Sequence, residues 1–257
     1  MIELKNIHKY YNPGSVNELC LFQNFSLQIE DRDFVAVVGS NGSGKTSLLN
    51  IICGSIPIDS GDIVVNGTSI VGKKDYLRHR RIGRVYQDPA KGTCPSMTIL
   101  ENLSIADNKG KPYNLGRGVN KVKINEYKEL LSTLNLGLED KLYTQVGSLS
   151  GGQRQALSLL MSTMTPIEFL ILDEHTAALD PKTADLIMEL TNQIVQEKKV
   201  TTIMVTHNLR YAVEYGNRLI MMHQGEAIID KCGDEKKALT TEDIMSTFNR
   251  ISVECGN

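Results

Sequence analysis

One short stretch of glycine, serine, lysine and threonine limits the fold of this chain more than any other. It runs through Gly39, Ser40, Asn41, Gly42, Ser43, Gly44, Lys45 and Thr46. The spacing is glycine, four residues, glycine, lysine and threonine, which is the pattern of a phosphate-binding loop. An apolar run over 34–38 precedes it, and apolar residues at helical spacing follow over 46–52. The pattern predicts a buried strand, a glycine-rich turn and a helix in succession.

The chemistry of such a loop follows from its residue types. Glycines let backbone N–H groups approach phosphate oxygens, and the start of a helix adds positive potential. Lys45 can reach the β- and γ-phosphates, and the Thr46 hydroxyl can ligate Mg²⁺. The alternative is a glycine-rich turn with an unrelated lysine, and the flanking strand and helix argue against it. The stretch therefore indicates a nucleoside triphosphate site.

Length and charge narrow the class of protein. The chain has 257 residues, which suits one large α/β domain, and a formal net charge of −2. That charge gives no general reason to expect nucleic acid binding. No apolar run has the length of a membrane span, and residues 1–5 do not begin a secretory signal. We expect a cytosolic protein that reaches a membrane only through a partner.

A locally basic segment follows the phosphate-loop helix. Its basic residues are Lys73, Lys74, Arg78, Arg80, Arg81 and Arg84. The pattern favours a solvated helix face over a binding patch. Residues 82–86 then predict a strand that ends at Gln87. A polar residue in that place can reach a ligand at the carboxyl edge of the sheet.

Two carboxylates end another apolar run. Residues 169–172 predict a buried strand, and Asp173 and Glu174 follow at its tip. Alternation along a strand points these side chains in different directions, which allows two roles. Asp173 can hold Mg²⁺ through its water shell, and Glu174 can accept a proton from an attacking water. An acidic cap between strand and loop is the weaker alternative beside a phosphate loop.

A histidine and a pair of tyrosines are further candidates for nucleotide contact. His207 follows the strand predicted over 201–205 and can reach a γ-phosphate, which we favour over a structural role. Tyr10 and Tyr11 lie upstream of the phosphate loop, where a tyrosine ring can stack on adenine. From the residues alone, tyrosine at a strand edge explains them equally well.

A second helix start suited to anions lies far along the chain. Ser150 is a good N-cap, and Gly151 and Gly152 leave the first N–H groups of the next helix unobstructed before Gln153. A helical segment separates this start from the phosphate loop, so the two need not face the same phosphate within one chain. Further on, Asp180 is predicted to cap another helix.

These motifs together resemble the ATP-binding subunit of an ABC transporter, over essentially the whole chain. The stretch 39–46 matches the Walker A loop, 169–173 the Walker B strand and 149–153 the family signature. A five-residue match such as the signature arises by chance in about one of several thousand chains.

The resemblance also implies roles for single residues. Gln87 falls in the Q-loop, where it would ligate Mg²⁺ and sense the permease, and Asp180 falls in the D-loop. His207 matches the switch histidine, and Tyr11 fits the adenine-stacking position better than its neighbour. Ser47 is expected to contact the nucleotide as well.

The fold that the resemblance implies is a P-loop NTPase of the α/β class. It has a RecA-like core, an antiparallel β subdomain and an inserted α-helical subdomain. We expect a single ABC ATPase domain over 1–257, in which 1–91 and 156–257 form the core with the β subdomain. Residues 92–155 would form the helical subdomain, which ends in the signature and helps to receive the permease.

The implied cofactors are ATP and Mg²⁺, and the implied partners are a second copy and a permease. Two copies would pair head to tail, so that each Walker A loop faces the other chain's signature and two ATP molecules are enclosed. Closure on ATP and opening after hydrolysis would drive the transmembrane permease subunits. We also expect an extracytoplasmic solute-binding protein, no nucleic acid, and a place on the cytoplasmic face of the cell membrane through the permease.

Two positions depart from the common family pattern. His175 stands where most members have proline, and Ala156 stands where arginine is common. Together with Asn12-Pro13-Gly14 and the segment 181–184, the histidine variant looks like a bacterial importer subgroup, some of whose members are assigned to tryptophan or tyrosine uptake. His175 either perturbs the pKa of Glu174 or fills space, and the second is favoured.

The predicted function is ATP hydrolysis that energises an importer of a small solute such as an amino acid. An exporter ATPase shares the motifs and remains an alternative. A soluble ABC ATPase of DNA repair is disfavoured, because those proteins carry long coiled-coil insertions and this sequence has no sustained heptads. The intact Glu174, His207 and signature argue against a non-hydrolysing regulatory subunit.

Overall fold

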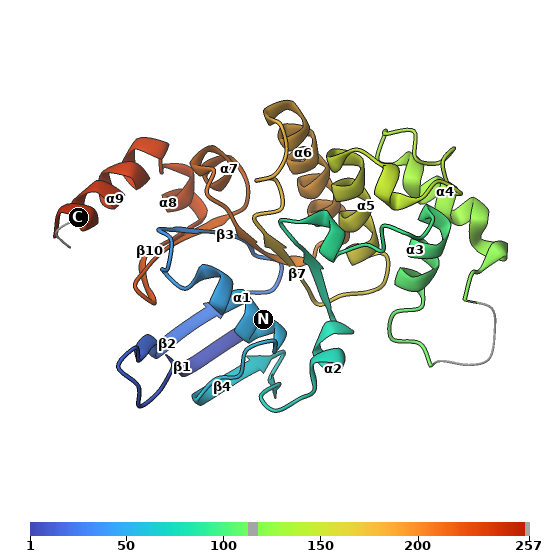
Figure 1. Ribbon diagram of the computed structural model, residues 1–257. Coiled ribbons are helices and arrows are strands. Elements are labelled where there is room, and N and C mark those ends of the chain that lie inside the picture. Colours follow the sequence, from blue (N-terminus) through green and yellow to red (C-terminus); the bar gives the residue numbers. More distant parts are fainter. Residues whose placement is uncertain (113–117, 255–257) are drawn as a thin grey trace. The chain divides into compact units, whose positions relative to one another are not determined.

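The computed structural model describes residues 1–112 and 118–254 (Figure 1). The chain forms two compact units, Met1–His79 with Lys199–Asn257 and Arg80–Lys198. This division follows contacts within the fold and does not test the functional division expected from the sequence, which stays a prediction. Among the described residues, no helix is both long and apolar enough to cross a bilayer.

An antiparallel sheet lies in the first unit. Its strands are β1 (Ile2–Tyr11), β2 (Leu19–Ile29), β4 (Ser60–Val65) and β5 (Thr68–Ser69), in the order β2-β1-β4-β5. Ile2 of β1 pairs with Ile29 of β2, and both are 1% exposed. Asn66 and Gly67 have φ values of 49° and 75°, as a two-residue hairpin turn requires. The sheet confirms the expected antiparallel β subdomain.

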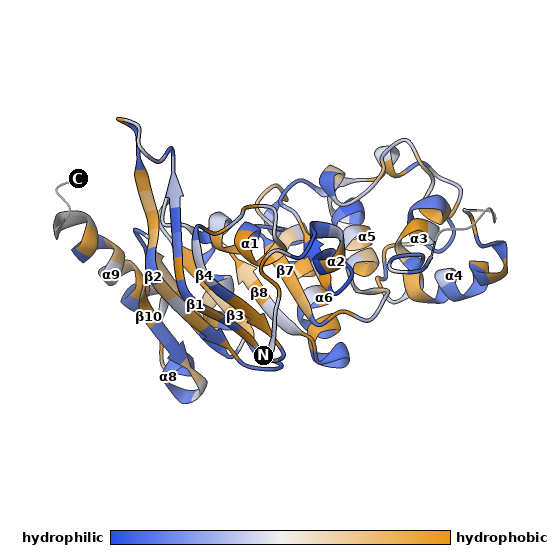
Figure 2. Ribbon diagram, turned by 90° about the horizontal axis from the view of Figure 1, so that it is seen from below, coloured by the Kyte–Doolittle hydropathy of each residue, from blue (hydrophilic) through white to orange (hydrophobic). Residues whose placement is uncertain are grey.

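A mixed sheet in the same unit carries the phosphate loop. Its strands in this unit are β10 (Glu226–Cys232), β9 (Arg218–His223), β3 (Phe34–Gly39) and β8 (Thr201–Val205), in that order. β3 runs parallel to β8 and β9, and β9 forms an antiparallel hairpin with β10. Every residue of β3 is buried, and most of the strand has the hydrophobic colour in Figure 2. Because the strand is buried on both faces, the run 34–38 is apolar throughout.

Helices pack around these strands in the first unit. They are α1 (Lys45–Cys53), α2 (Asp75–His79), α7 (Leu209–Glu214), α8 (Gly233–Lys237) and α9 (Thr241–Glu254). α1 contacts β3 and buries Leu48, Leu49, Ile51 and Ile52, which are the apolar residues of the predicted helix. It ends at Gly54, whose φ of 87° suits a glycine C-cap.

The second unit combines two parallel strands with helices. The strands are β6 (Ile82–Val85) and β7 (Phe169–Asp173), and the helices are α3 (Ile99–Asp107), α4 (Ile124–Ser132), α5 (Gly151–Thr163) and α6 (Pro181–Lys198). Short 3₁₀ turns lie at Pro89–Lys91, Lys121–Lys123 and Val146–Ser148. α5 packs against β6, α3 and α6, which ties the signature helix to the strand that precedes Gln87.

Candidate functional site

The phosphate loop joins β3 to α1, as the sequence predicts. A Cβ atom added at Gly39 would collide with the Met222 carbonyl of β9, so the loop leaves the sheet where only glycine fits. Gly42 and Gly44 have φ values of 78° and 100°, which favour glycine. A Cβ added at Gly42 would have no heavy atom within 4 Å. The backbone at this position is therefore open to a ligand.

Lys45 lies folded over this loop. Its Nζ donates to the Gly39 and Ser40 carbonyls, at 2.8 Å each, and the residue is only 5% exposed. Two hydrogen bonds hold the buried ammonium above the start of α1, where the helix dipole also favours an anion. Thr46 follows in the first turn and is exposed. The loop thus presents a fixed positive charge and an accessible hydroxyl.

The hairpin between β9 and β10 supports the loop from outside. The Gly225 N–H donates to the Ser43 carbonyl at 3.1 Å. Gly225 has a φ of 81°, and a Cβ added there would collide with the Leu21 carbonyl. The sequence gives no sign of this contact, because residues 43 and 225 lie far apart in the chain.

Tyr11 lies beside the first turn of α1. Its hydroxyl is 3.2 Å from Oγ of Ser47, and the Lys9 ammonium is 5.5 Å from the centre of its ring. Tyr11 is the last residue of β1. Its position therefore agrees both with stacking on adenine and with a tyrosine that only ends a strand. The contact brings two predicted nucleotide-binding residues together.

His207 leaves the sheet at the same edge as the phosphate loop. β3 and β8 are parallel neighbours, with Val37 opposite Val205, so Gly39 and His207 both follow their strands at the carboxyl edge. His207 is exposed, and the next residue, Asn208, caps α7 by accepting from the N–H of Arg210 at 3.1 Å. The cap fixes the backbone that carries the histidine.

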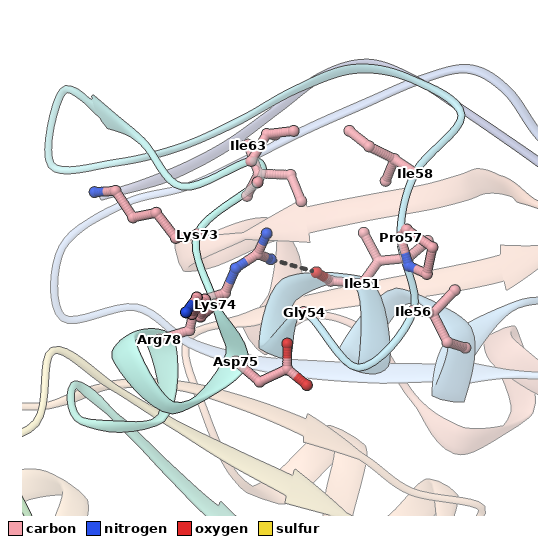
Figure 3. A pocket seen from close by; sticks show the side chains of 12 residues that line it. Ile51, Gly54, Ile56, Pro57, Ile58, Ile63, Lys73, Lys74, Asp75 and Arg78 are labelled. Carbon is pink, nitrogen blue, oxygen red and sulfur yellow. Dashed lines mark hydrogen bonds between the residues drawn. The ribbon is translucent and has the colours of Figure 1, made fainter.

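A pocket of about 430 Å³ lies at the opposite end of α1 (Figure 3). Its lining includes Ile51, Ile56, Ile58 and Lys74, and Arg78 donates from Nη1 to the Ile51 carbonyl at 3.1 Å. Burial lowers the pKa of Arg78, which caps the last carbonyls of the helix. Nine residues of helix, about 13 Å, separate this pocket from the phosphate loop, so the pocket is not the phosphate site.

In the second unit, Gln87 and the two carboxylates leave neighbouring strands at one edge. β6 and β7 are parallel, with Val85 opposite Leu172. Gln87 therefore follows β6 at the edge where Asp173 ends β7 and Glu174 follows it. Gln155 of α5 donates to the Tyr86 carbonyl at 3.0 Å and holds the backbone just before Gln87.

Asp173 forms a short ion pair. Nη2 of Arg84 lies 2.7 Å from its Oδ2, and the side chains are 8% and 13% exposed. The solvated helix face predicted for the basic segment is therefore wrong at two residues: Arg84 lies in β6, and Arg78 caps α1. The exposed Lys73 and Lys74 fit that prediction.

Glu174 begins a tight turn with a left-handed backbone, at a φ of 49°. The Ala177 N–H donates to its carbonyl at 3.0 Å. The next residue, His175, is 2% exposed, and its Nε2 lies 3.1 Å from Oγ1 of Thr191 in α6. The Thr191 hydroxyl donates to the Ile187 carbonyl at 2.7 Å, so it accepts its bond from the His175 N–H.

Burial of His175 makes the ring neutral. Desolvation lowers its pKa to about 4, so it carries no charge near neutral pH. The imidazole anchors the turn after Glu174 to α6 through a hydrogen bond. Of the two roles considered for this residue, the structure favours packing over a charge effect on Glu174.

The signature residues form the capped start of α5. Ser150 Oγ accepts from the Gln153 N–H at 3.2 Å, and the Gln153 side chain accepts from the Ser150 N–H at 3.3 Å. A Cβ added at Gly152 would collide with the Thr183 side chain. Asp180 Oδ1 accepts from the Thr183 N–H at 3.1 Å, and hydrogen bonds from the Thr183 side chain and from this N–H lower the pKa of Asp180. The start of α5 therefore lies beside the start of α6.

The candidate residues fall into two groups, one in each unit. The first unit contains Tyr11, Ser47, His207 and the loop 39–46, with Tyr11 in contact with Ser47. The second unit contains Gln87, Asp173 and Glu174 at one sheet edge, and Asp180 and the signature residues 150–153 at the starts of α6 and α5.

Comparison with known proteins identifies the family to which these residues belong. The sequence profile of the family described as "ABC transporter" matches residues 22–177. The chain belongs to the ABC transporter family. It is 50% identical, over 96% of its length and 98% of the relative's, to the "Tyrosine transport ATP-binding protein" of Clostridioides difficile. It is 32% identical, over 90% of its length and 89% of the relative's, to the "Phosphonates import ATP-binding protein PhnC" of Lactobacillus delbrueckii subsp. bulgaricus.

A solved structure agrees with this assignment. The ATP-binding cassette MJ0796, in a dimeric post-hydrolysis state bound to ADP and Pi, superposes with a TM-score of 0.75. It is 28% identical, over 90% of this chain and 98% of the solved one. These comparisons confirm the expected family, the P-loop NTPase fold and the class of enzyme, an ATPase. This ABC transporter subunit binds ATP.

Proposed function

We propose that this subunit hydrolyses ATP to drive the uptake of an aromatic amino acid, foremost tyrosine, through an ABC importer. The observation that carries the proposal is the 50% identity to a tyrosine transport ATP-binding protein over 96% of the chain. Identity to the phosphonate import relative is 32%. The phosphonate relative is named for import, which favours an importer over the exporter alternative.

Binding of the nucleotide belongs to the first unit. Lys45 and the N–H groups of 39–46 hold the phosphates, and Tyr11 stacks on the adenine beside Ser47. His207 reaches the γ-phosphate from the adjacent strand end. The fixed ammonium and the open backbone at Gly42 support these roles, since both suit an anionic ligand.

Hydrolysis belongs to the second unit. Glu174 accepts the proton of the attacking water, because its carboxylate stands at the strand tip next to Asp173. Its backbone is held on both sides, by the end of β7 and by the anchored His175. A general base needs such fixed placement relative to the water that it activates.

The candidate metal ligands suit Mg²⁺ by their chemistry. Thr46, Gln87 and Asp173 all offer oxygen atoms, which this ion prefers. Thr46 lies in the first turn of α1, Gln87 follows the end of β6 by two residues, and Asp173 ends β7. Thr46 and Gln87 are exposed. Bound there, Mg²⁺ would neutralise charge on the β- and γ-phosphates.

The signature acts on the nucleotide of a second copy. Ser150 and Gly151 are exposed, while Gly152 packs on α6 and Gln153 completes the cap. The dimer reported for MJ0796 supports pairing of two copies, head to tail, with Asp180 near the shared boundary. Residues 92–155 receive the permease, which places the subunit on the cytoplasmic face of the membrane, and an extracytoplasmic solute-binding protein delivers the substrate.

Substrate identity is tested in proteoliposomes that contain the subunit, its permease and the solute-binding protein. ATP hydrolysis is measured with tyrosine, tryptophan or a phosphonate as the transported solute. We expect the strongest stimulation with tyrosine. Stimulation by the phosphonate alone would overturn the proposed substrate class.

Replacing Ser150 with alanine tests the shared site. We expect ATP hydrolysis to fall at least tenfold while ATP binding to the single subunit stays unchanged, because the hydroxyl would serve the other copy's nucleotide. Thr98→Ala is the matched control, since Thr98 caps α3 with the same capping box. Each change removes an N-cap that contributes about 1 kcal/mol to the free energy of unfolding. Loss of binding to the single subunit in Ser150→Ala would argue against a site shared between copies.

A further inference from the structure

Arg84 directly contacts a candidate metal ligand, Asp173. Its Nη2 lies 2.7 Å from Oδ2 of Asp173. With 8% and 13% of their surfaces exposed, both side chains are largely shielded from water, so this is not an ordinary surface ion pair. Removing one partner of such a pair would leave the other charge buried and uncompensated.

The strands place Arg84 for this contact. β6 and β7 are parallel, and Arg84 stands opposite Ile171, two residues before Asp173. A long guanidinium side chain spans that distance along the sheet. The Ser162 hydroxyl of α5 donates to the Arg84 carbonyl at 3.0 Å, so the backbone of Arg84 is fixed as well.

The guanidinium also touches the strand end that carries Gln87. Its central carbon lies 4.6 Å from the centre of the Tyr86 ring, within the range of a cation–π contact. Arg84 therefore bridges Asp173 and the residue before Gln87.

The charge of Arg84 acts against a metal ion at Asp173. A divalent cation that approaches this carboxylate meets a guanidinium that already neutralises it, and like charges repel strongly where water is scarce. The triphosphate of ATP brings about four negative charges, which would outweigh one arginine. Arg84 thus penalises metal alone much more than metal that arrives with nucleotide.

We propose that Arg84 is a positioning residue that holds the Asp173 carboxylate and discourages Mg²⁺ from binding before ATP. The inference rests on the proposed metal role of Asp173. The Arg84 guanidinium favours entry of the metal ion together with the nucleotide. Until then it keeps the Asp173 carboxylate in one orientation.

The test measures binding of Mn²⁺, as a paramagnetic probe in place of Mg²⁺, to the full-length subunit without nucleotide. We expect Arg84→Gln to bind Mn²⁺ about tenfold more tightly than the natural chain, because a cation next to the carboxylate is gone. Arg84→Lys keeps the charge, so we expect its Mn²⁺ affinity to stay within about twofold of that of the natural chain. The matched control is Arg81→Gln, which removes an exposed arginine from a 2.6 Å ion pair with Glu168. It should leave Mn²⁺ binding unchanged.

The outcomes separate this inference from the proposed metal site. Unchanged Mn²⁺ affinity in Arg84→Gln would overturn the role of Arg84, and so would an equal gain in Arg84→Lys. Asp173→Asn is measured with ATP present, where we expect weaker Mn²⁺ binding. If Asp173→Asn has no effect there, the metal role of Asp173 itself fails. Should Arg84→Gln not fold, as judged by circular dichroism, Arg84→Met replaces it with the same expected gain.

Discussion

Replacing Glu174 with glutamine is expected to abolish ATP turnover while ATP binding is retained. An amide cannot accept the proton of the attacking water, and a positioned general base contributes about 10²- to 10⁴-fold to such a reaction. Glutamine has nearly the same shape, so the turn at a φ of 49° and the anchor at His175 should persist. Phosphate release gives the turnover, and a fluorescent ATP analogue gives the affinity.

The matched control for this variant is Glu168→Gln. Glu168 comes just before the start of β7, and its side chain is 26% exposed in an ion pair with Arg81. The control loses one carboxylate from the same region but none from the strand tip. Turnover of Glu174→Gln within twofold of the natural chain would rule out Glu174 as the base.

Replacing Lys45 with methionine is expected to weaken ATP binding at least about 100-fold, since the charged hydrogen bonds to phosphate are lost together with the loop contacts. The ammonium bonds the carbonyls of Gly39 and Ser40 at 2.8 Å and lies at the start of α1. No neighbouring residue in the loop carries a positive charge. Equilibrium binding of the fluorescent analogue measures the effect.

Lys236 offers a close control for the lysine variant. It is 3% exposed and donates to two backbone carbonyls, those of Val213 and Tyr215, much as Lys45 does. Lys236→Met should cost similar folding stability and leave ATP affinity unchanged. Equal loss of affinity in both variants would mean that the effect of Lys45 is one of folding and not of phosphate binding.

The features that the sequence predicts well are local ones. The phosphate loop depends on contiguous residues between a strand and a helix, and the glycine requirements at Gly39 and Gly42 follow from that turn. The acidic tip of β7 and the cap at Ser150 are also set by neighbours within a few residues. Each of these could be placed because its pattern and its structure span the same short segment.

The contacts that the sequence does not reveal join distant segments. Arg84 and Asp173 are 89 positions apart, and their contact depends on the register of two parallel strands. Gly225 meets Ser43 only because the β9–β10 hairpin turns beside the phosphate loop. Charge pattern alone placed Arg84 on a solvated face, although its place within a predicted strand was a signal for burial. The other signal for this ion pair is that the predicted strand over 169–172 ends in the carboxylate of Asp173.

We expect ATP to join two copies of this subunit across shared sites. Light scattering of Glu174→Gln, with and without ATP and Mg²⁺, tests this most directly, because this variant should hold the nucleotide without consuming it. We predict that the particle mass doubles when ATP is added, and that Glu174→Gln combined with Ser150→Ala dimerises less. A particle mass that stays at one chain in saturating ATP would rule out dimerisation driven by ATP.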